Sequence, residues 1–192
     1  MAGEKIASFG LPDDERRQQH FCVKEAVMPF GRFPGADVIL GPEMKSTGEV
    51  MGIANNFPSA YAKTQAAASM ELPTSGTCFV SVCDRDKRPI LPLARDLTSA
   101  SIPCTVIGRI GDEEPNIGTK IMNGEIDLVI NTPFGQETRG DGYQLRTMCV
   151  RQNLCYVTTL AGAQAFVSAI ENLRDENLPV IALQDLDQWE ER

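Results

Sequence analysis

The stretch Asp127-Leu-Val-Ile-Asn-Thr-Pro-Phe-Gly135 decides the fold of this 192-residue chain. A short apolar run bounded by turn residues is typical of a strand buried on both faces of a parallel sheet. We therefore predict a buried strand over Asp127–Asn131. The run continues into Asn131 and Thr132, and ligands of such sheets bind beyond the carboxyl ends of the strands.

Strands and helices alternate on both sides of this run. Further strands are predicted over Cys78–Val82, Pro103–Ile107, Cys155–Thr158 and Pro179–Leu183. Helical spacing of apolar residues, or capping residues, predicts helices that include Ile90–Leu97, Pro115–Asn123, Leu145–Gln152, Ala163–Ile170 and Asp185–Arg192. This alternation predicts an α/β fold with an open parallel sheet flanked by helices.

The first third of the chain has a different character. We predict a polar leader over Met1–Gln19 and a strand over Phe21–Val27. A Gly- and Pro-rich region of loops and short strands follows over Pro29–Gly52, and then a helix over Phe57–Met70. Asn56 is the expected N-cap of that helix. The turn residues of Leu72-Pro-Thr-Ser-Gly76 end the helical pattern, and we predict a domain boundary there, between residues 1–72 and 73–192.

Composition excludes several classes of protein. A net charge of −8 argues against a nucleic-acid binder, which needs clustered Lys and Arg. The six cysteines include no C-x-x-C pair and follow no signal peptide, which favours a reduced, cytoplasmic setting. The single histidine, His20, lies far from any cysteine pair, so a metal site is not expected. No apolar run is long enough to span a membrane.

Small polar residues stand where three of the predicted strands end. These positions are Ser81, Asn131 with Thr132, and Thr158 with Thr159. Hydroxyls, an amide and backbone N–H groups suit a phosphate, and Lys87 or Arg109 could supply positive charge. The alternative is that the Ser, Thr and Asn side chains only cap helices.

Several motifs, read together, resemble one family. They are Leu40–Gly52, Asp127–Gly135 and Tyr156–Ala163, with further matches at Val23–Val27, Phe33–Gly35, Cys83–Arg88 and Asn123–Asp127. In this order they resemble the C-terminal end of the carbamoyl-phosphate synthetase large subunit. The resemblance implies that residues 1–72 are the remnant of the second ATP-grasp domain. It implies that residues 73–192 are a regulatory domain similar to methylglyoxal synthase.

The resemblance implies a regulatory rather than a catalytic role. The parent enzyme is an ATP-dependent, glutamine-hydrolysing ligase that supplies pyrimidine and arginine synthesis, and it uses ATP and Mg. Its catalytic core lies outside this sequence, so we expect no catalytic residue and no cofactor here. The expected partners are the rest of the large subunit, the glutamine-amidotransferase small subunit and a nucleotide effector. The implied effector-binding residues are Ser81, Lys87, Arg109, Asn131, Thr132, Thr158 and Thr159.

The chain departs from the family pattern in two places. The family has a strand, an Ala-Thr-x-Gly-Thr phosphate loop and a helix where Leu97-Thr-Ser99 here runs directly into Ala100-Ser-Ile-Pro103. Glu114 replaces an arginine, and a carboxylate repels phosphate. We therefore expect effector binding to be weak or lost.

Other interpretations remain open. A free-standing phosphate-binding or methylglyoxal-synthase-like lyase would need an aspartate base from among Asp84, Asp86 and Asp141, although these residues can also serve as capping or turn residues. A decayed gene product that folds poorly is a third hypothesis. The stripe of Phe166, Val167 and Ile170 could face an oligomer interface, but a core-facing helix is the simpler interpretation.

Overall fold

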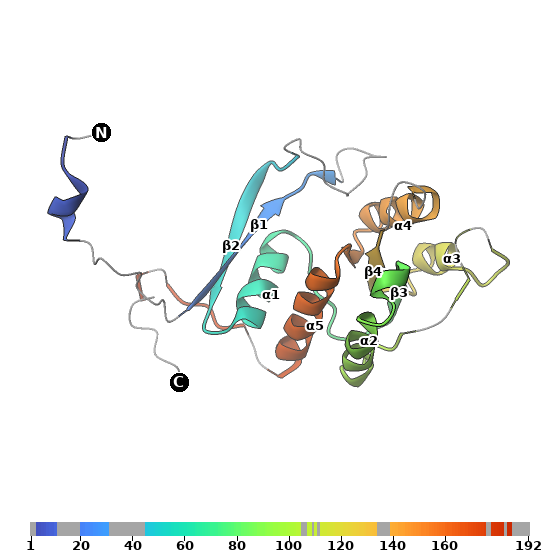
Figure 1. Cartoon of the computed structure of the whole chain (residues 1–192). Coiled ribbons are helices and arrows are strands. Elements are labelled where there is room, and N and C mark those ends of the chain that lie inside the picture. Colours follow the sequence, from blue (N-terminus) through green and yellow to red (C-terminus); the bar gives the residue numbers. More distant parts are fainter. Residues whose placement is uncertain are drawn as a thin grey trace.

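The computed structural model describes residues 3–10, 20–30, 45–104, 107–108, 110, 112–133, 139–175, 178–182 and 184–185. Two separate sheets organise these residues, one with two strands and one with three. Figure 1 shows the two-stranded ribbon on one side and the three-stranded sheet on the other, with helices α1 and α5 between them. A short 3₁₀ turn, η1 (Ile6–Phe9), precedes the ribbon in the chain.

The ribbon pairs β1 (Phe21–Val27) with β2 (Gly48–Ala54) in antiparallel register. β1 confirms the strand predicted over the same residues. Gly52 lies so close to α1 that a Cβ at this position would overlap the carbonyl oxygen of Ala60. Part of the glycine-rich stretch Leu40–Gly52 is therefore a strand that packs on a helix, while residues 40–44 lie outside the described residues.

Helix α1 (Phe57–Ala67) joins the ribbon to the rest of the molecule. Asn56 caps it as predicted, since its Oδ1 accepts a hydrogen bond from the Ser59 backbone N–H at 2.8 Å. On the side facing α5, the Ser59 hydroxyl lies 2.6 Å from Oδ1 of Asn172. The rings of Tyr61 and Phe166 have centroids 5.8 Å apart. α1 thus packs on both β2 and α5.

The second sheet contains β3 (Cys78–Val82), β4 (Leu128–Thr132) and β5 (Cys155–Val157). The strands are parallel and lie in the order β3-β4-β5. All five residues of β4 are buried, as expected for the central strand of a sheet covered on both faces. The α/β fold class and the three strands predicted in these regions are confirmed.

Helices cover both faces of this sheet. They are α2 (Ile90–Ser99), α3 (Ile117–Met122), α4 (Arg139–Arg151) and α5 (Leu160–Asp175). Apolar residues of α2 and α5 pack on one face with Leu128 and Ile130, while residues of α3 and α4 pack on the other face with Val129. Phe166 and Ile170 of α5 are at most 2% exposed, so the core-facing interpretation of that stripe is correct.

The chain returns to the sheet directly after α2. Ser101 adopts φ of +60°, and the Ile102 N–H donates to the Leu97 carbonyl at 2.9 Å, which ends the helix. Cys104 then forms an isolated parallel bridge to Cys78 at the outer edge of β3. Among the residues described between 103 and 107, this bridge is all that forms of the strand predicted over Pro103–Ile107.

The prediction of a strand over Pro179–Leu183 is wrong for the part of it that the structure describes. Residues 178–182 belong to no strand. This segment instead lines a hollow of about 370 Å³ with residues of β2 and α1. Pro179 has no N–H for a sheet ladder, and Val180 is 94% exposed. Figure 1 shows that α5 leads the chain toward the ribbon rather than toward β3–β5. Of the terminal helix predicted over Asp185–Arg192, only Asp185 lies within the described residues.

Candidate functional site

The strands of the parallel sheet end side by side at one edge. Ser81 of β3 is the register partner of Asn131 in β4, and Val82 is the partner of Thr132. β5 ends at Val157, which pairs with Ile130, so Thr158 follows at the same edge. Five of the seven residues predicted to bind an effector are therefore brought to the ends of these strands or directly beyond them, namely Ser81, Asn131, Thr132, Thr158 and Thr159.

Asn131 is fixed by two hydrogen bonds. Its Nδ2 donates to the carbonyl oxygen of Ser81 at 3.1 Å. Its Oδ1 accepts from Nη1 of Arg146 on α4, also at 3.1 Å. Asn131 is 7% exposed and Arg146 only 1%, so a buried guanidinium lies directly behind the strand ends. The amide therefore joins β3, β4 and α4.

Arg146 is the residue of this edge that sequence reasoning missed. The one available signal was its spacing from Gly142, one helical turn earlier, because small residues leave room for large neighbours. A Cβ on Gly142 would lie 2.9 Å from Nη1 of Arg146, and the glycine therefore makes space for the guanidinium.

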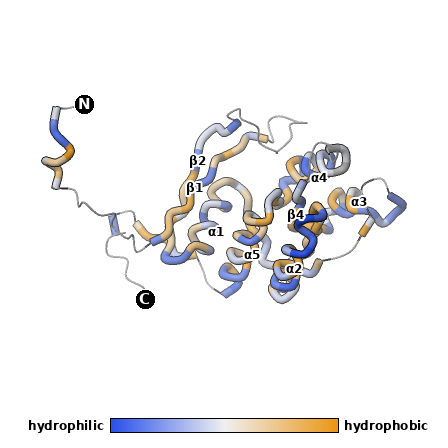
Figure 2. Tube along the Cα trace, in the orientation of Figure 1, coloured by the Kyte–Doolittle hydropathy of each residue, from blue (hydrophilic) through white to orange (hydrophobic). Residues whose placement is uncertain are grey.

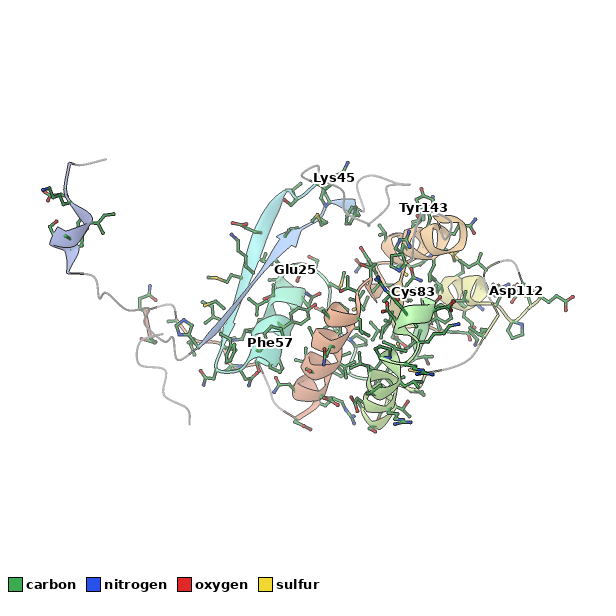
Figure 3. All side chains as sticks on the ribbon, in the orientation of Figure 1. Glu25, Lys45, Phe57, Cys83, Asp112 and Tyr143 are labelled. Carbon is green, nitrogen blue, oxygen red and sulfur yellow. The ribbon has the colours of Figure 1, made fainter. Side chains whose placement is uncertain are left out.

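Thr132 and the residues after β3 form a second polar group. The Thr132 hydroxyl accepts a hydrogen bond from the Cys83 backbone N–H at 3.1 Å. The Cys83 thiol donates to Oδ2 of Asp86 at 3.1 Å. Hydrogen bonds from the side chains of Cys83 and Thr132 lower the pKa of Asp86. Figure 3 labels Cys83 at this end of the sheet. The edge thus carries an ionised carboxylate, which opposes an approaching phosphate.

Thr158 and Thr159 connect β5 to α5. The Thr159 hydroxyl accepts a hydrogen bond from the Gly162 N–H at 3.0 Å, so this side chain caps the helix, as the alternative interpretation stated. A Cβ on Gly162 would lie 2.5 Å from Cγ2 of Val157 and 2.9 Å from that hydroxyl oxygen, which explains the glycine. Thr158 is half-buried. The N-terminus of a 16-residue helix nevertheless faces this edge, and such termini favour anions.

Of the two cations predicted to bind the phosphate, Lys87 and Arg109, the structure describes only Lys87. Lys87 follows the 3₁₀ turn η3 (Asp84–Asp86), and its Nζ lies 2.7 Å from Oδ1 of Asp84 in an exposed ion pair. The Lys87 ammonium lowers the pKa of Asp84. Figure 2 shows the hydrophilic segment between β3 and α2 that carries both residues. Arg109 lies outside the described residues.

Asn116 is the N-cap of the helix α3, and Glu114 holds this cap and the first turn in place. Oε1 of Glu114 accepts hydrogen bonds from Nδ2 of Asn116, at 2.9 Å, and from the Thr119 hydroxyl. Its Oε2 accepts from the Asn116 backbone N–H at 3.1 Å. A carboxylate at a helix N-terminus is favourable. The contacts of Glu114 thus give it a structural task in addition to the phosphate repulsion expected from the sequence.

Two of the three aspartates considered for lyase chemistry, Asp84 and Asp86, already have polar partners. Asp84 pairs with Lys87, and Asp86 accepts hydrogen bonds, so neither is placed as a base of raised pKa. Asp141 lies in α4, while His20 precedes the ribbon strand β1. Across the described ranges, no three His, Cys, Asp or Glu side chains gather as metal ligands. In the same ranges no helix is long and apolar enough to cross a bilayer.

Comparisons with known proteins agree with this architecture. Residues 94–158 match the family model described as an MGS-like domain. The chain is 42% identical over 202 residues to the carbamoyl phosphate synthase large chain of Myxococcus xanthus, covering 96% of this chain and 19% of that protein. A large chain of Methanothermobacter thermautotrophicus is also 42% identical, with the same two shares covered.

A separate C-terminal section matches equally well. The carbamoyl phosphate synthase large chain, C-terminal section, of Methanopyrus kandleri is 43% identical over 95% of this chain and 37% of its own length. The Myxococcus alignment has 202 positions against 192 residues here, so at least ten positions of that relative have no counterpart in this chain. The chain spans about a fifth of the full-length relatives. Over nearly its whole length, it is homologous to the C-terminal part of carbamoyl phosphate synthase large chains, and within that part it contains an MGS-like domain.

Proposed function

We propose that this chain is the regulatory C-terminal portion of a carbamoyl-phosphate-synthesising ligase. Its site would hold the phosphate of a nucleotide effector at the ends of β3, β4 and β5. The observation that carries the proposal is the meeting of Ser81, Asn131 and Thr132 at one edge of the sheet. This edge lies in a chain similar over 96% of its length to such large chains.

Affinity for the effector is expected to be low. The Asp86 carboxylate lies against Cys83, and Asp84 holds Lys87 in an ion pair. The chain also passes from α2 to the bridge at Cys104 without the phosphate loop of the family pattern. With a carboxylate present and that loop absent, we expect dissociation constants in the millimolar range, at the weak end of specific binding.

In this proposal the chain does not catalyse a reaction alone. Residues 1–72 are the end of an ATP-grasp domain, and residues 73–192 are the regulatory domain. The packing of α1 on both the ribbon and α5 would connect the two. The proposed partners are the rest of the large chain and the glutamine-amidotransferase small subunit, in the cytoplasm. The ATP and Mg of the parent reaction would bind to those other parts.

Thermal melts with nucleotides test the effector site. A ligand that binds the native state alone raises the melting temperature. Uridine or inosine monophosphate at about ten times a millimolar dissociation constant is expected to raise it by a few degrees, while uridine does not. Lys87→Gln should reduce that shift. Lys120→Gln, which breaks a comparable ion pair with Glu125, should leave the shift unchanged.

Two results would overturn the proposal. The first is a cooperative melt that no nucleotide or inorganic phosphate shifts, which would mean that the fold is kept and the site is lost. The second is turnover of dihydroxyacetone phosphate to methylglyoxal by the isolated chain, which would favour the lyase. A melt without cooperativity would instead identify a poorly folding product.

A further inference from the structure

Two cysteines lie side by side on one face of the parallel sheet. Cys78 opens β3, and Cys104 forms a parallel bridge to it from the segment after α2. The Cys78 N–H donates to the Pro103 carbonyl at 3.2 Å, which fixes this register. Residues paired across a ladder point to the same face of the sheet. Both side chains accordingly belong to the apolar cluster under α2 and α5.

The two thiols interact with each other and differ in exposure. A hydrogen bond between the thiols raises the pKa of Cys78, which is fully buried, and burial raises it further. The same hydrogen bond lowers the pKa of Cys104, which is half-buried. Cys104 is therefore the more accessible and more readily ionised partner, and thiolates are the reactive form.

We propose that Cys78 and Cys104 are a site of reversible disulfide formation, which fastens the segment after α2 to the outer edge of β3. Neighbouring strands lie about 4.8 Å apart. This spacing falls within the range of about 4.4–6.8 Å that usually separates the Cα atoms of two disulfide-linked cysteines. Among the described residues, the Cys78–Cys104 bridge is the pairing on this side of β3. The crosslink would thus strengthen the β3 edge of the sheet.

The reaction needs a small disulfide such as oxidised glutathione. The Cys104 thiolate attacks one sulfur of that disulfide, whose S–S bond breaks, and one glutathione thiolate leaves and takes up a proton. The Cys78 thiol then loses its proton to solvent and attacks Sγ of Cys104, which releases the second glutathione. Two protein thiols are oxidised, and one glutathione disulfide is reduced to two thiols. The raised pKa of Cys78 makes the second step the slower one.

The competing thiols are separated from this pair by the fold. Cys155 belongs to β5, and Leu128 of β4 lies between it and Cys78 in register. Cys149 packs on the opposite face of the sheet. Cys22 is exposed on β1, far from the parallel sheet in the fold. The pairing predicted here is therefore specific.

Oxidation of the folded chain tests the proposal. After treatment with oxidised glutathione, alkylation and proteolysis, mass spectrometry should find peptides joined through Cys78 and Cys104. The melting temperature should rise by about 5–15 °C and return after dithiothreitol. Cys104→Ala should lose both effects, whereas Cys22→Ser should keep both.

Other outcomes would overturn it. A crosslink through Cys83, Cys149 or Cys155 would show that the wrong pair had been chosen. A stable mixed disulfide of Cys104 with glutathione would show that Cys78 cannot reach it. A Cys78–Cys104 crosslink that forms only in denaturant would show that the native strands hold the sulfurs apart. None of these readouts depends on nucleotide binding, so the proposed function can fail independently.

Discussion

Arg146 donates a hydrogen bond from Nη1 to Oδ1 of Asn131 at 3.1 Å, across the interface between α4 and β4. Because Asn131 in turn donates to the Ser81 carbonyl, one amide couples a helix to the ends of two strands. Both side chains are almost completely buried. Buried polar groups with satisfied partners fix one arrangement, since any alternative leaves a donor or acceptor unpaired.

Arg146→Lys should therefore destabilise the protein. A lysine cannot reproduce the planar guanidinium, so Oδ1 of Asn131 would lose this donor inside the protein. We expect the free energy of unfolding, measured in urea, to fall by about 1–3 kcal/mol. Arg151→Lys changes an exposed arginine of the same helix and should stay within about 0.5 kcal/mol of wild type. Equal effects of the two substitutions would contradict the assigned role of Arg146.

Two glycines of α4 make a matched pair. Alanine is favoured over glycine in helices by about 1 kcal/mol, and a Cβ on Gly140 would meet no atom of the described residues within 4 Å. Gly140→Ala should therefore raise the free energy of unfolding by about 0.5–1 kcal/mol. A Cβ on Gly142 would lie 2.9 Å from Nη1 of Arg146.

Gly142→Ala should accordingly lower stability, by about 1 kcal/mol after the gain in helix propensity. The same urea titration checks both substitutions. Combining Gly142→Ala with Arg146→Lys should cost less than the two changes separately, because both disturb one guanidinium. Stabilisation by Gly142→Ala would mean that the guanidinium can move aside freely.

The sequence predicted the parts of the fold that depend on local pattern. β1 and β3 have the bounds expected from their apolar runs, and Asn56 caps α1 as its position suggested. Pro179–Leu183 has equally apolar residues but forms no strand over its described part. A strand forms only where the edge of another strand is available to pair with it. Whether such an edge is near depends on the direction in which the chain leaves α5. That direction is a tertiary property, which a short stretch of sequence does not contain.

The candidate site was predictable only in its location. Topology brings strand ends together, so Ser81, Asn131 and Thr132 could be assigned to one edge. Their partners could not be assigned. Arg146 lies in a weakly amphipathic helix, where a buried arginine and an exposed one look alike in sequence. The contact of Asp86 with Cys83 depends on the tight turn after β3.

Glu25 should make stability depend on pH. It lies between the ribbon and α1 (Figure 3), where burial raises its pKa although Gln65 donates a hydrogen bond to it. A carboxyl with a raised pKa in the folded state binds its proton more tightly there than in the unfolded chain. Its contribution is therefore fully present below the unfolded value of 4.5 and is lost as pH rises through the folded pKa.

Glu25→Gln should consequently increase stability at pH 7 and flatten the decline above pH 4.5. The new amide also brings an N–H donor near Gln65, whose Oε1 has no hydrogen-bond partner among the described residues. Urea titrations between pH 4 and 8 measure this profile. Glu49→Gln, at an exposed ion pair with Lys24 on the same ribbon, is the control and should change the profile little. A steeper decline in Glu25→Gln would refute the assignment.

Ser69 ends α1 in a conformation that glycine prefers. Its φ is +64°, its N–H donates to the Ala66 carbonyl at 3.0 Å, and the Met70 N–H donates to the Gln65 carbonyl at 2.9 Å. This is the pattern in which the residue after a helix is left-handed, at a cost of about 1–2 kcal/mol for a residue with a Cβ. Ser69→Gly should raise the free energy of unfolding by about 0.5–1 kcal/mol, because relief of that strain exceeds the added entropy of the unfolded chain.

Ala67→Gly, two residues earlier and still helical, should have the opposite effect and cost about 0.5–1 kcal/mol. The opposite signs distinguish a demand for left-handed backbone from a general response of this segment to glycine. Thermal and urea unfolding of both variants measure the difference. If both substitutions destabilised the chain equally, the end of α1 would lie elsewhere than at Ser69.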